Sequence, residues 1–80
     1  MNCYTAVKMR LLELMDEKNM SMHGLAMSAG LSPSTLKSIL YGKSQNPGIV
    51  TLKILCDGMD VTLAEFFNAP IFRNLEQEIE

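Results

Sequence analysis

The 80-residue chain has the length of one small domain, which buries roughly 60–65% of the surface exposed by its unfolded form. Its hydrophobic residues, 48% of the total, are mostly Leu, Ile, Met and Ala, which favours helices over strands. The longest uncharged stretch, residues 19–36, is broken by serines, glycines and a proline, which excludes a membrane span. The N-terminus lacks the layout of a secretory signal, so we expect a soluble, cytoplasmic protein.

The two cysteines, Cys3 and Cys56, are far apart in the sequence, and His23 is the only histidine that could join them as a metal ligand. Neither a zinc site nor a disulfide framework is therefore indicated. We expect Cys56 to be a small core residue, Cys3 a free terminal thiol and His23 an exposed side chain. No catalytic constellation of nucleophile, base and carboxylate is evident either. The sequence therefore predicts a protein that is not an enzyme and needs no metal or cofactor.

The charges are unevenly distributed along the chain, whose formal net charge is −2. Residues 18–56 hold four lysines and no acid, namely Lys18, Lys37, Lys43 and Lys53. A polyanion responds to local potential, screened over about 8–10 Å, so a basic face is compatible with an acidic total. Lys8 and Arg10 lie among acids and are expected to be solvated.

The first third of the chain predicts two helices. Thr5 can cap the first, which runs to about Lys18 and buries one stripe spaced as on a helix face: Val7, Leu11, Leu14 and Met15. Ser21 is a good N-cap for the second, over residues 22–29.

The centre of the chain predicts a sharp turn and a third helix. Gly30 suits the left-handed conformation that ends a helix, and Leu31 fills the gap between the two helices. Ser32 then caps, and Pro33 takes the first helical position, where its missing N–H does no harm. The third helix should run to about Tyr41, bury Leu36, Ile39 and Leu40, and end at Gly42. Residues 22–41 thus predict a helix-turn-helix.

Beyond a polar loop, residues 43–48, a fourth helix is expected from about Ile49 to Asp57. Thr62 and Glu65 have the spacing of a capping box and open a short fifth helix. The remainder carries a helically spaced apolar stripe, which predicts a C-terminal tail helix: Ile71, Phe72, Leu75 and Ile79.

From Val7 to Phe67 the sequence resembles the phage-repressor and Cro-like (XRE-type) family of helix-turn-helix domains. The matching residues occur in the same order and spacing: Leu25-Ala26, Ala29-Gly30-Leu31-Ser32, Leu36, Ile39, Gly42-Lys43, Asn46-Pro47, Leu52, Met59-Asp60-Val61-Thr62-Leu63 and Glu65-Phe66-Phe67. The resemblance implies an all-α, compact five-helix repressor-like fold whose third helix enters the major groove of DNA, usually as a dimer. We assign residues 1–68 to this domain and residues 69–80 to a C-terminal tail.

The resemblance also implies which residues meet DNA. Base-facing positions of the third helix correspond to Pro33, Ser34 and Ser38, with Lys37 exposed alongside. The backbone-contacting rim corresponds to Tyr41, Lys43, Ser44 and Gln45. Short hydroxyls can reach base edges, whereas lysine supplies a point charge for phosphates. The full predicted site is Ser32, Pro33, Ser34, Thr35, Lys37, Ser38, Tyr41, Lys43, Ser44 and Gln45.

Two departures from the family pattern affect function and packing. The second helix commonly begins with a phosphate-clamping Gln, where this chain has Met22. An Arg of the first helix and a Glu of the third, often paired in the family, correspond to Met15 and Leu40. Since both partners are apolar, the contact leaves no buried charge unpaired, and we expect the two side chains to touch in the core.

The function predicted is a sequence-specific, DNA-binding transcriptional regulator. The partners are double-stranded DNA and a second copy of the chain, held through the C-terminal region. The alternative for the tail is that it folds back over the fourth and fifth helices of its own domain. The alternative function is a protein-interaction module that keeps the helix-turn-helix fold with weak or no DNA binding, which Met22 and the acidic total favour. The third helix carries no Arg, Asn or Gln for bidentate contact with bases, so specificity could depend on Lys37 and DNA shape.

Overall fold

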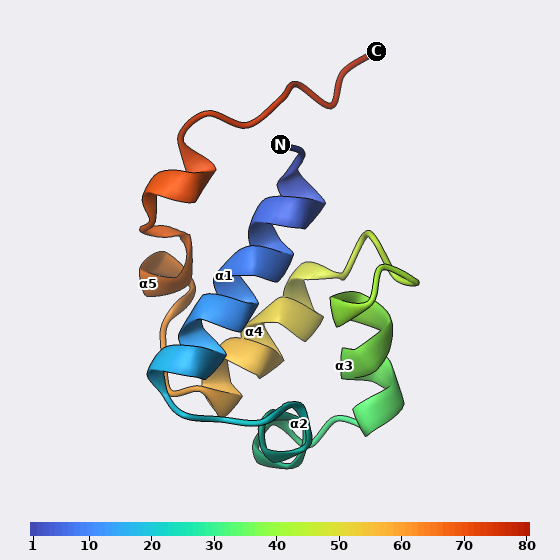
Figure 1. Ribbon diagram of the computed structural model, residues 1–80, viewed down its shortest axis with the longest axis vertical. Helices are drawn as coiled ribbons and strands as arrows, with labels where there is room; N and C mark the ends of the chain where they lie inside the picture. Colours follow the sequence, from blue (N-terminus) through green and yellow to red (C-terminus); the bar gives the residue numbers. More distant parts are fainter.

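A computed structural model describes residues 1–80 as five α-helices and one short 3-10 turn, without strands (Figure 1). The helices are α1 (Cys3–Glu17), α2 (Met22–Ala29), α3 (Pro33–Leu40), α4 (Ile49–Gly58) and α5 (Leu63–Phe67), followed by η1 (Pro70–Phe72). The all-α, five-helix fold expected from the sequence is therefore confirmed. No helix combines the length and apolar composition that crossing a bilayer requires.

The first helix begins three residues earlier than predicted, because its cap is Asn2 and not Thr5. The cap is Asn2, whose side chain accepts a hydrogen bond from the Thr5 backbone N–H at 2.9 Å. Asn satisfies the free N–H groups of a first turn at least as well as Thr does. Thr5 therefore lies inside α1, and the added turn brings Cys3 and Tyr4 into the helix.

The turn between α2 and α3 forms as predicted. The Ser21 side chain caps α2, and Gly30 ends it with φ 70° and ψ 25°, a left-handed conformation that glycine adopts without a Cβ clash. Ser32 caps α3 ahead of Pro33, and Leu31 packs against the core. These contacts fix the angle at which α3 leaves α2.

One hydrophobic core joins the five helices. Its largest fully buried side chains are Phe66, Leu11, Leu25, Leu36 and Leu55. Met15 and Leu40 both belong to this core cluster, 7% and 8% exposed, as expected from the apolar replacement of the charged pair. Cys56 is buried in the same cluster, whereas Cys3 is exposed.

Two helices approach each other closely where α2 crosses the end of α4. A Cβ built on Gly58 would lie 3.0 Å from the Ala29 Cβ and 3.1 Å from the Ala29 Cα and N. The Ser28 hydroxyl donates to the Gly58 carbonyl at 2.9 Å across the same contact. The small residues here allow α2, the support of α3, to pack directly on α4.

Arg10 is a structural residue, and the expectation that it is merely solvated was wrong. Its side chain is 12% exposed, and it donates from Nε to the Phe66 carbonyl at 2.7 Å and from Nη2 to the Glu65 carbonyl at 2.9 Å. It also pairs with Glu13. Helix ends leave carbonyls without intrahelical partners, so Arg10 caps the end of α5 from α1.

The predicted C-terminal tail helix is wrong beyond one turn. Only η1 is helical, and residues 73–80 run without regular structure across the start of α1 (Figure 1). The Glu76 backbone N–H donates to the Met1 carbonyl at 3.1 Å, and the Glu76 carboxylate pairs with the terminal ammonium at 3.1 Å. These partners lie at the far end of the chain, so local periodicity could not indicate them.

Folding back covers part of the apolar stripe of the tail. The Phe72 ring lies against the rings of Phe66 and Phe67, with centroids 5.9 and 5.0 Å away. Leu75 is half-buried, whereas Ile79 is 84% exposed. The tail thus folds back, as the alternative from the sequence had it, but it covers α5 and the start of α1 and leaves the large apolar side chain of Ile79 exposed.

Candidate nucleic-acid interface

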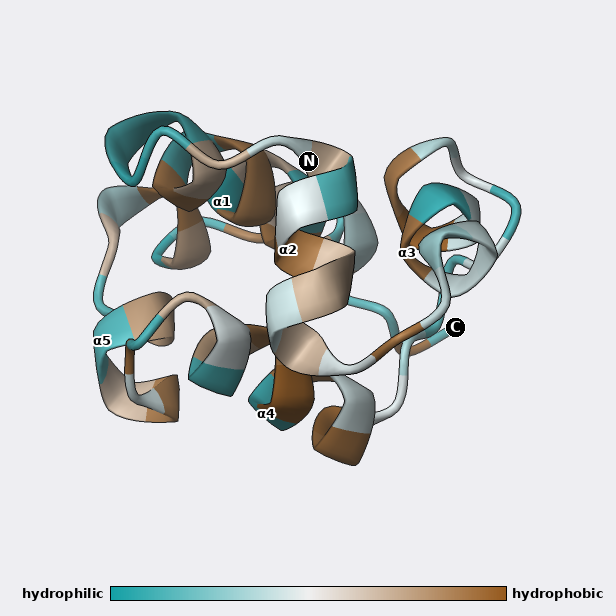
Figure 2. Ribbon diagram, turned by 90° about the horizontal axis from the view of Figure 1, so that it is seen from below, coloured by the Kyte–Doolittle hydropathy of each residue, from teal (hydrophilic) through white to brown (hydrophobic).

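The helix α3 forms one side of the molecule, with α5 on the opposite side (Figures 1 and 2). Its inner stripe, Leu36, Ile39 and Leu40, is buried in the core. Its outer stripe has the spacing i, i+3, i+4 and i+7 and consists of Ser34, Lys37, Ser38 and Tyr41. The outer stripe of α3 is therefore a continuous polar face with one aromatic residue at its end.

A cluster of hydroxyls lies at the start of α3. The Ser32 Oγ accepts from the Thr35 backbone N–H at 3.3 Å and lies 2.9 Å from Thr35 Oγ1 and 3.1 Å from Ser34 Oγ. Ser32 therefore has a capping role whatever else it contacts. Pro33, Ser34 and Thr35 are all exposed beside it and lie where α3 begins.

Only two of the four lysines in the acid-free stretch lie beside α3. Lys53 forms an ion pair with Asp57 on α4, and Lys18 is the C-cap of α1. Lys37 and Lys43 are exposed and form no ion pair with an acid. The basic face is therefore narrower than the sequence suggested and is centred on α3 and the loop after it.

The loop after α3 presents polar groups next to these lysines. Tyr41 is 70% exposed, and its ring centroid lies 5.9 Å from the Lys37 ammonium. Gly42 turns the chain with φ 85°. The Gln45 side chain donates to the Gly42 carbonyl at 3.0 Å, so this predicted rim residue also holds the loop.

The ten predicted site residues form one contiguous strip over α3 and this loop, residues 32–45. Eight of them are exposed, and Ser38 and Ser44 are half-buried. The Ser44 backbone N–H donates to the Ser38 carbonyl at 2.8 Å, which folds the loop against the end of α3. The arrangement offers hydroxyls at one end and cations with an aromatic ring at the other.

Most of the chain, from within α1 to beyond the end of α5, matches a known family. The family model of the Cro/C1-type HTH DNA-binding domain matches residues 10–70. The chain belongs to this family. The resemblance to Cro-like domains noted in the sequence is thereby confirmed, and the family is one of DNA-binding domains.

A solved structure with a similar fold comes from a prophage. It is the crystal structure of the prophage Lp1 protein 11, 28% identical, with a TM-score of 0.79 over 94% of this chain and all of that one. Among curated proteins no match was found. The similarity extends across nearly the whole fold.

Met22 lies where the resemblance to the family implies a Gln that binds phosphate, and it cannot make the same contact. Met22 is half-buried and packs against the core at the start of α2. A thioether is at most a weak hydrogen-bond acceptor, so it offers a phosphate no donor. Met22 therefore adds no side-chain donor to the polar surface beside α3.

One residue that touches the strip was missed in the sequence. Tyr4, in the first turn of α1, donates its hydroxyl to the Ile39 carbonyl at 2.5 Å, near the end of α3. It precedes the matched range, residues 10–70, and nothing in its local sequence points to α3. Its spacing from Val7 and Leu11, which places it beside the buried stripe, was the only available signal.

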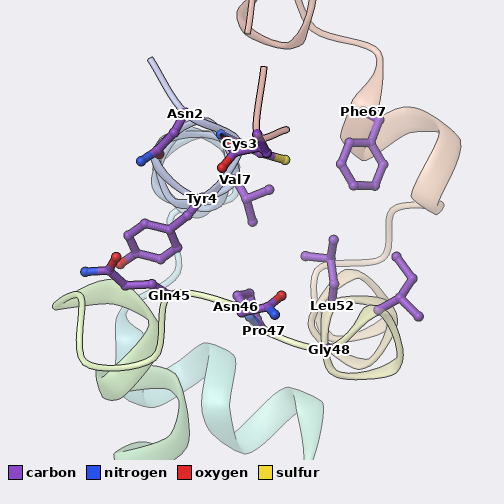
Figure 3. A pocket seen from close by; sticks show the side chains of 12 residues that line it. Asn2, Cys3, Tyr4, Val7, Gln45, Asn46, Pro47, Gly48, Leu52 and Phe67 are labelled. Carbon is purple, nitrogen blue, oxygen red and sulfur yellow. Dashed lines mark hydrogen bonds between the residues drawn. The ribbon is translucent and has the colours of Figure 1, made fainter. Parts of the chain in front are cut away.

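The largest cavity is an open groove of about 650 Å³. Its walls come from the start of α1, the loop before α4, and Phe67 of α5 (Figure 3). Val7, Leu52 and Phe67 provide its apolar surface, and Glu78 of the tail lies at its edge. Gln45 of the strip also lines the groove, whereas Lys37 and Lys43 do not, so the groove and the basic strip meet at Gln45.

Proposed function

We propose that the protein is a sequence-specific, DNA-binding transcriptional regulator that inserts α3 into the major groove. The observation that carries the proposal is the outer stripe of α3, polar along its length, together with Lys37 and Lys43, which have no acidic partners. A major groove about 12 Å wide admits a single helix of this kind. Membership of a family of DNA-binding domains supports the same conclusion.

The strip divides into two roles under this proposal. Pro33, Ser34 and Ser38 face base edges, with Thr35 and Lys37 beside them. Tyr41, Lys43, Ser44 and Gln45 form the rim that meets the phosphate backbone, and Ser32 holds the start of the helix. Hydroxyls and one lysine discriminate bases less strongly than bidentate Arg or Asn does, so DNA shape contributes to specificity.

We further propose that the protein acts in the cytoplasm as a homodimer joined through its C-terminal region. Ile79 is 84% and Phe67 38% exposed there, and each offers apolar surface to a second copy. Two domains on half-sites about 34 Å apart add their contacts, which offsets weak contacts per subunit.

The proposal is tested by titrating the protein against random duplex DNA at low and moderate salt. Binding should weaken steeply with salt, because each neutralised phosphate releases counterions. Lys37→Ala and Lys43→Ala should each weaken binding and reduce the slope of log K against log salt by about 1 for every phosphate that the lysine neutralises. Lys53→Ala is the matched control, because Lys53 pairs with Asp57 on α4, and it should change neither quantity.

The competing function is a protein-interaction module on the same fold. The open groove beside α1 and the absence of a polar clamp at Met22 favour it. A flat salt response, or wild-type affinity in both Lys37→Ala and Lys43→Ala, would support this alternative and contradict DNA binding through the strip.

A further inference from the structure

The last turn of α3 leaves carbonyl groups that no residue within the helix can satisfy. The Lys37 carbonyl accepts from the Tyr41 backbone N–H at 2.9 Å, and the Ser38 carbonyl from Ser44 at 2.8 Å. The Ile39 carbonyl is different, since its partner is the Tyr4 hydroxyl of α1 at 2.5 Å. The end of α3 is therefore tied both to its own loop and to another helix.

Tyr4 lies directly beneath the loop that follows α3. A Cβ built on Gly42 would lie 3.8 Å from the Tyr4 hydroxyl and equally far from Gln45 Nε2. The Tyr4 ring points from α1 toward Gln45 (Figure 3), and Lys8 Nζ lies 5.9 Å from its centroid on the same helix. The hydroxyl thus contacts the place where α3 ends and the loop turns.

The first turn of α1, which carries Tyr4, is itself held at several points. Asn2 caps it, and the Cys3 backbone N–H donates to the Glu78 carboxylate at 3.1 Å. The terminal ammonium pairs with Glu76. Tyr4 therefore projects toward α3 from a turn fixed by both its own cap and the C-terminal tail.

We infer that Tyr4 is a positioning residue for the DNA-contacting strip. By bonding to the Ile39 carbonyl it fixes the end of α3 and the loop, residues 41–45, and so sets where Tyr41 and Lys43 meet the phosphate backbone. This inference rests on the proposed function. Without the hydroxyl, the last turn of α3 opens more often, and each opening moves the rim away from its binding geometry.

The test is Tyr4→Phe, which removes the hydroxyl and keeps the ring. At a temperature well below unfolding, DNA affinity should fall by up to about fivefold, because one ordinary hydrogen bond changes the opening equilibrium by that factor and only the closed form binds. Amide hydrogen exchange at Ser44, measured without DNA, should become faster by a similar factor, because its bond to the Ser38 carbonyl closes the same loop.

Ser28→Ala is the matched control. This variant also removes a hydroxyl that donates to the carbonyl of a residue at the end of another helix. The acceptor is Gly58 of α4, so the lost bond lies on the α2–α4 contact and not beside α3. It should lower the thermal midpoint as much as Tyr4→Phe does and leave DNA affinity and Ser44 exchange at wild-type values.

Two results would overturn the inference: wild-type DNA affinity in Tyr4→Phe, or an equal reduction of affinity in Ser28→Ala, which would mark a general effect of stability. A wild-type protein that binds no duplex would contradict the proposed function instead. In that case, faster Ser44 exchange in Tyr4→Phe would still assign the loop-fixing role to Tyr4, and unchanged exchange would reject it.

Discussion

Glu65 and Thr62 exchange two hydrogen bonds at the start of α5. The Thr62 backbone N–H donates to the Glu65 carboxylate at 3.0 Å, and the Glu65 N–H donates to the Thr62 hydroxyl at 3.0 Å. The hydrogen bond from the Thr62 backbone N–H is the main cause that lowers the pKa of the Glu65 carboxyl, and hydrogen bonding of the carboxyl with the Thr62 side chain is the second cause. A carboxyl whose pKa is lower in the folded chain than in the unfolded chain favours folding when it is ionised.

We predict that Glu65→Gln reduces the acid sensitivity of the fold. The contribution of Glu65 is fully present above its unfolded pKa of about 4.3 and is lost as the pH falls through its lower folded value. Wild-type protein should lose more free energy of unfolding between about pH 6 and pH 3 than the variant does, in urea titrations at a series of pH values. Glu17→Gln removes an exposed carboxylate with no hydrogen bond or ion pair and should retain the wild-type dependence. Parallel curves for wild type and Glu65→Gln would refute the assignment.

The residues that were predicted well are those whose partners lie within four positions. Ser21, Ser32 and the Thr62–Glu65 pair all bond to backbone groups three residues away, so their chemistry is visible in the sequence. Tyr4 and Arg10 act on carbonyls 35 or more residues away. No local pattern indicates such partners, which explains why the roles of both side chains emerged only from the fold.

The contact between α2 and α4 determines where the support of α3 lies. Gly58 is the residue that permits it, because a side chain there would meet the Ala29 backbone, which cannot move aside as a flexible side chain could. The helices were predictable from periodicity and caps, and the small Ala29 side chain is compatible with a close neighbour of α2. Nothing in the sequence alone identifies Gly58 as that neighbour.

We predict that Gly58→Ala destabilises the protein by about 1–3 kcal/mol, although alanine favours helices more than glycine does. The measurement is urea unfolding, and the control is a double-mutant cycle with Ala29→Gly, which removes the nearest atom at 3.0 Å. The double variant should recover only part of the stability, because the Ala29 backbone contacts at 3.1 Å remain. A Gly58→Ala protein as stable as wild type would show that the helices can separate freely.

The C-terminal tail forms no regular helix beyond η1, although its apolar residues have helical spacing. Pro70 begins only a 3-10 turn, and the rest of the tail forms a hydrogen bond and an ion pair with the first residues of the chain, at the start of α1. Glu76 pairs with the terminal ammonium, and Glu78 accepts a hydrogen bond from the Cys3 backbone N–H, so both partners come from the other end of the chain. The fold-back still leaves Ile79 exposed.

At the scale of the whole molecule, a tail folded over α1 still leaves apolar surface for a second copy. We predict a dimer in sedimentation experiments at tens of micromolar, weakened by Ile79→Ser because it removes the most exposed large apolar side chain. Met27→Ser, at a residue 67% exposed on α2, is the control and should not alter the assembly. A monomer at this concentration would count against dimerisation through the C-terminal region.

The net charge of the molecule differs in sign from the local charge beside α3. The formal net charge of −2 describes the whole chain, but a duplex approaching α3 meets Lys37 and Lys43 with no acid paired to them. The acid-free stretch was evident in the sequence, whereas the pairing of Lys53 with Asp57 required the structure. The strip over residues 32–45 is therefore the surface through which we propose that the protein binds DNA.

The most direct measurement is amide chemical-shift mapping of isotope-labelled protein as duplex DNA is added at low salt. We predict that the largest shifts fall within residues 32–45, with smaller ones at the start of α2. Shifts confined to the groove lined by Val7, Leu52 and Phe67, or no shifts at all, would contradict DNA binding through α3.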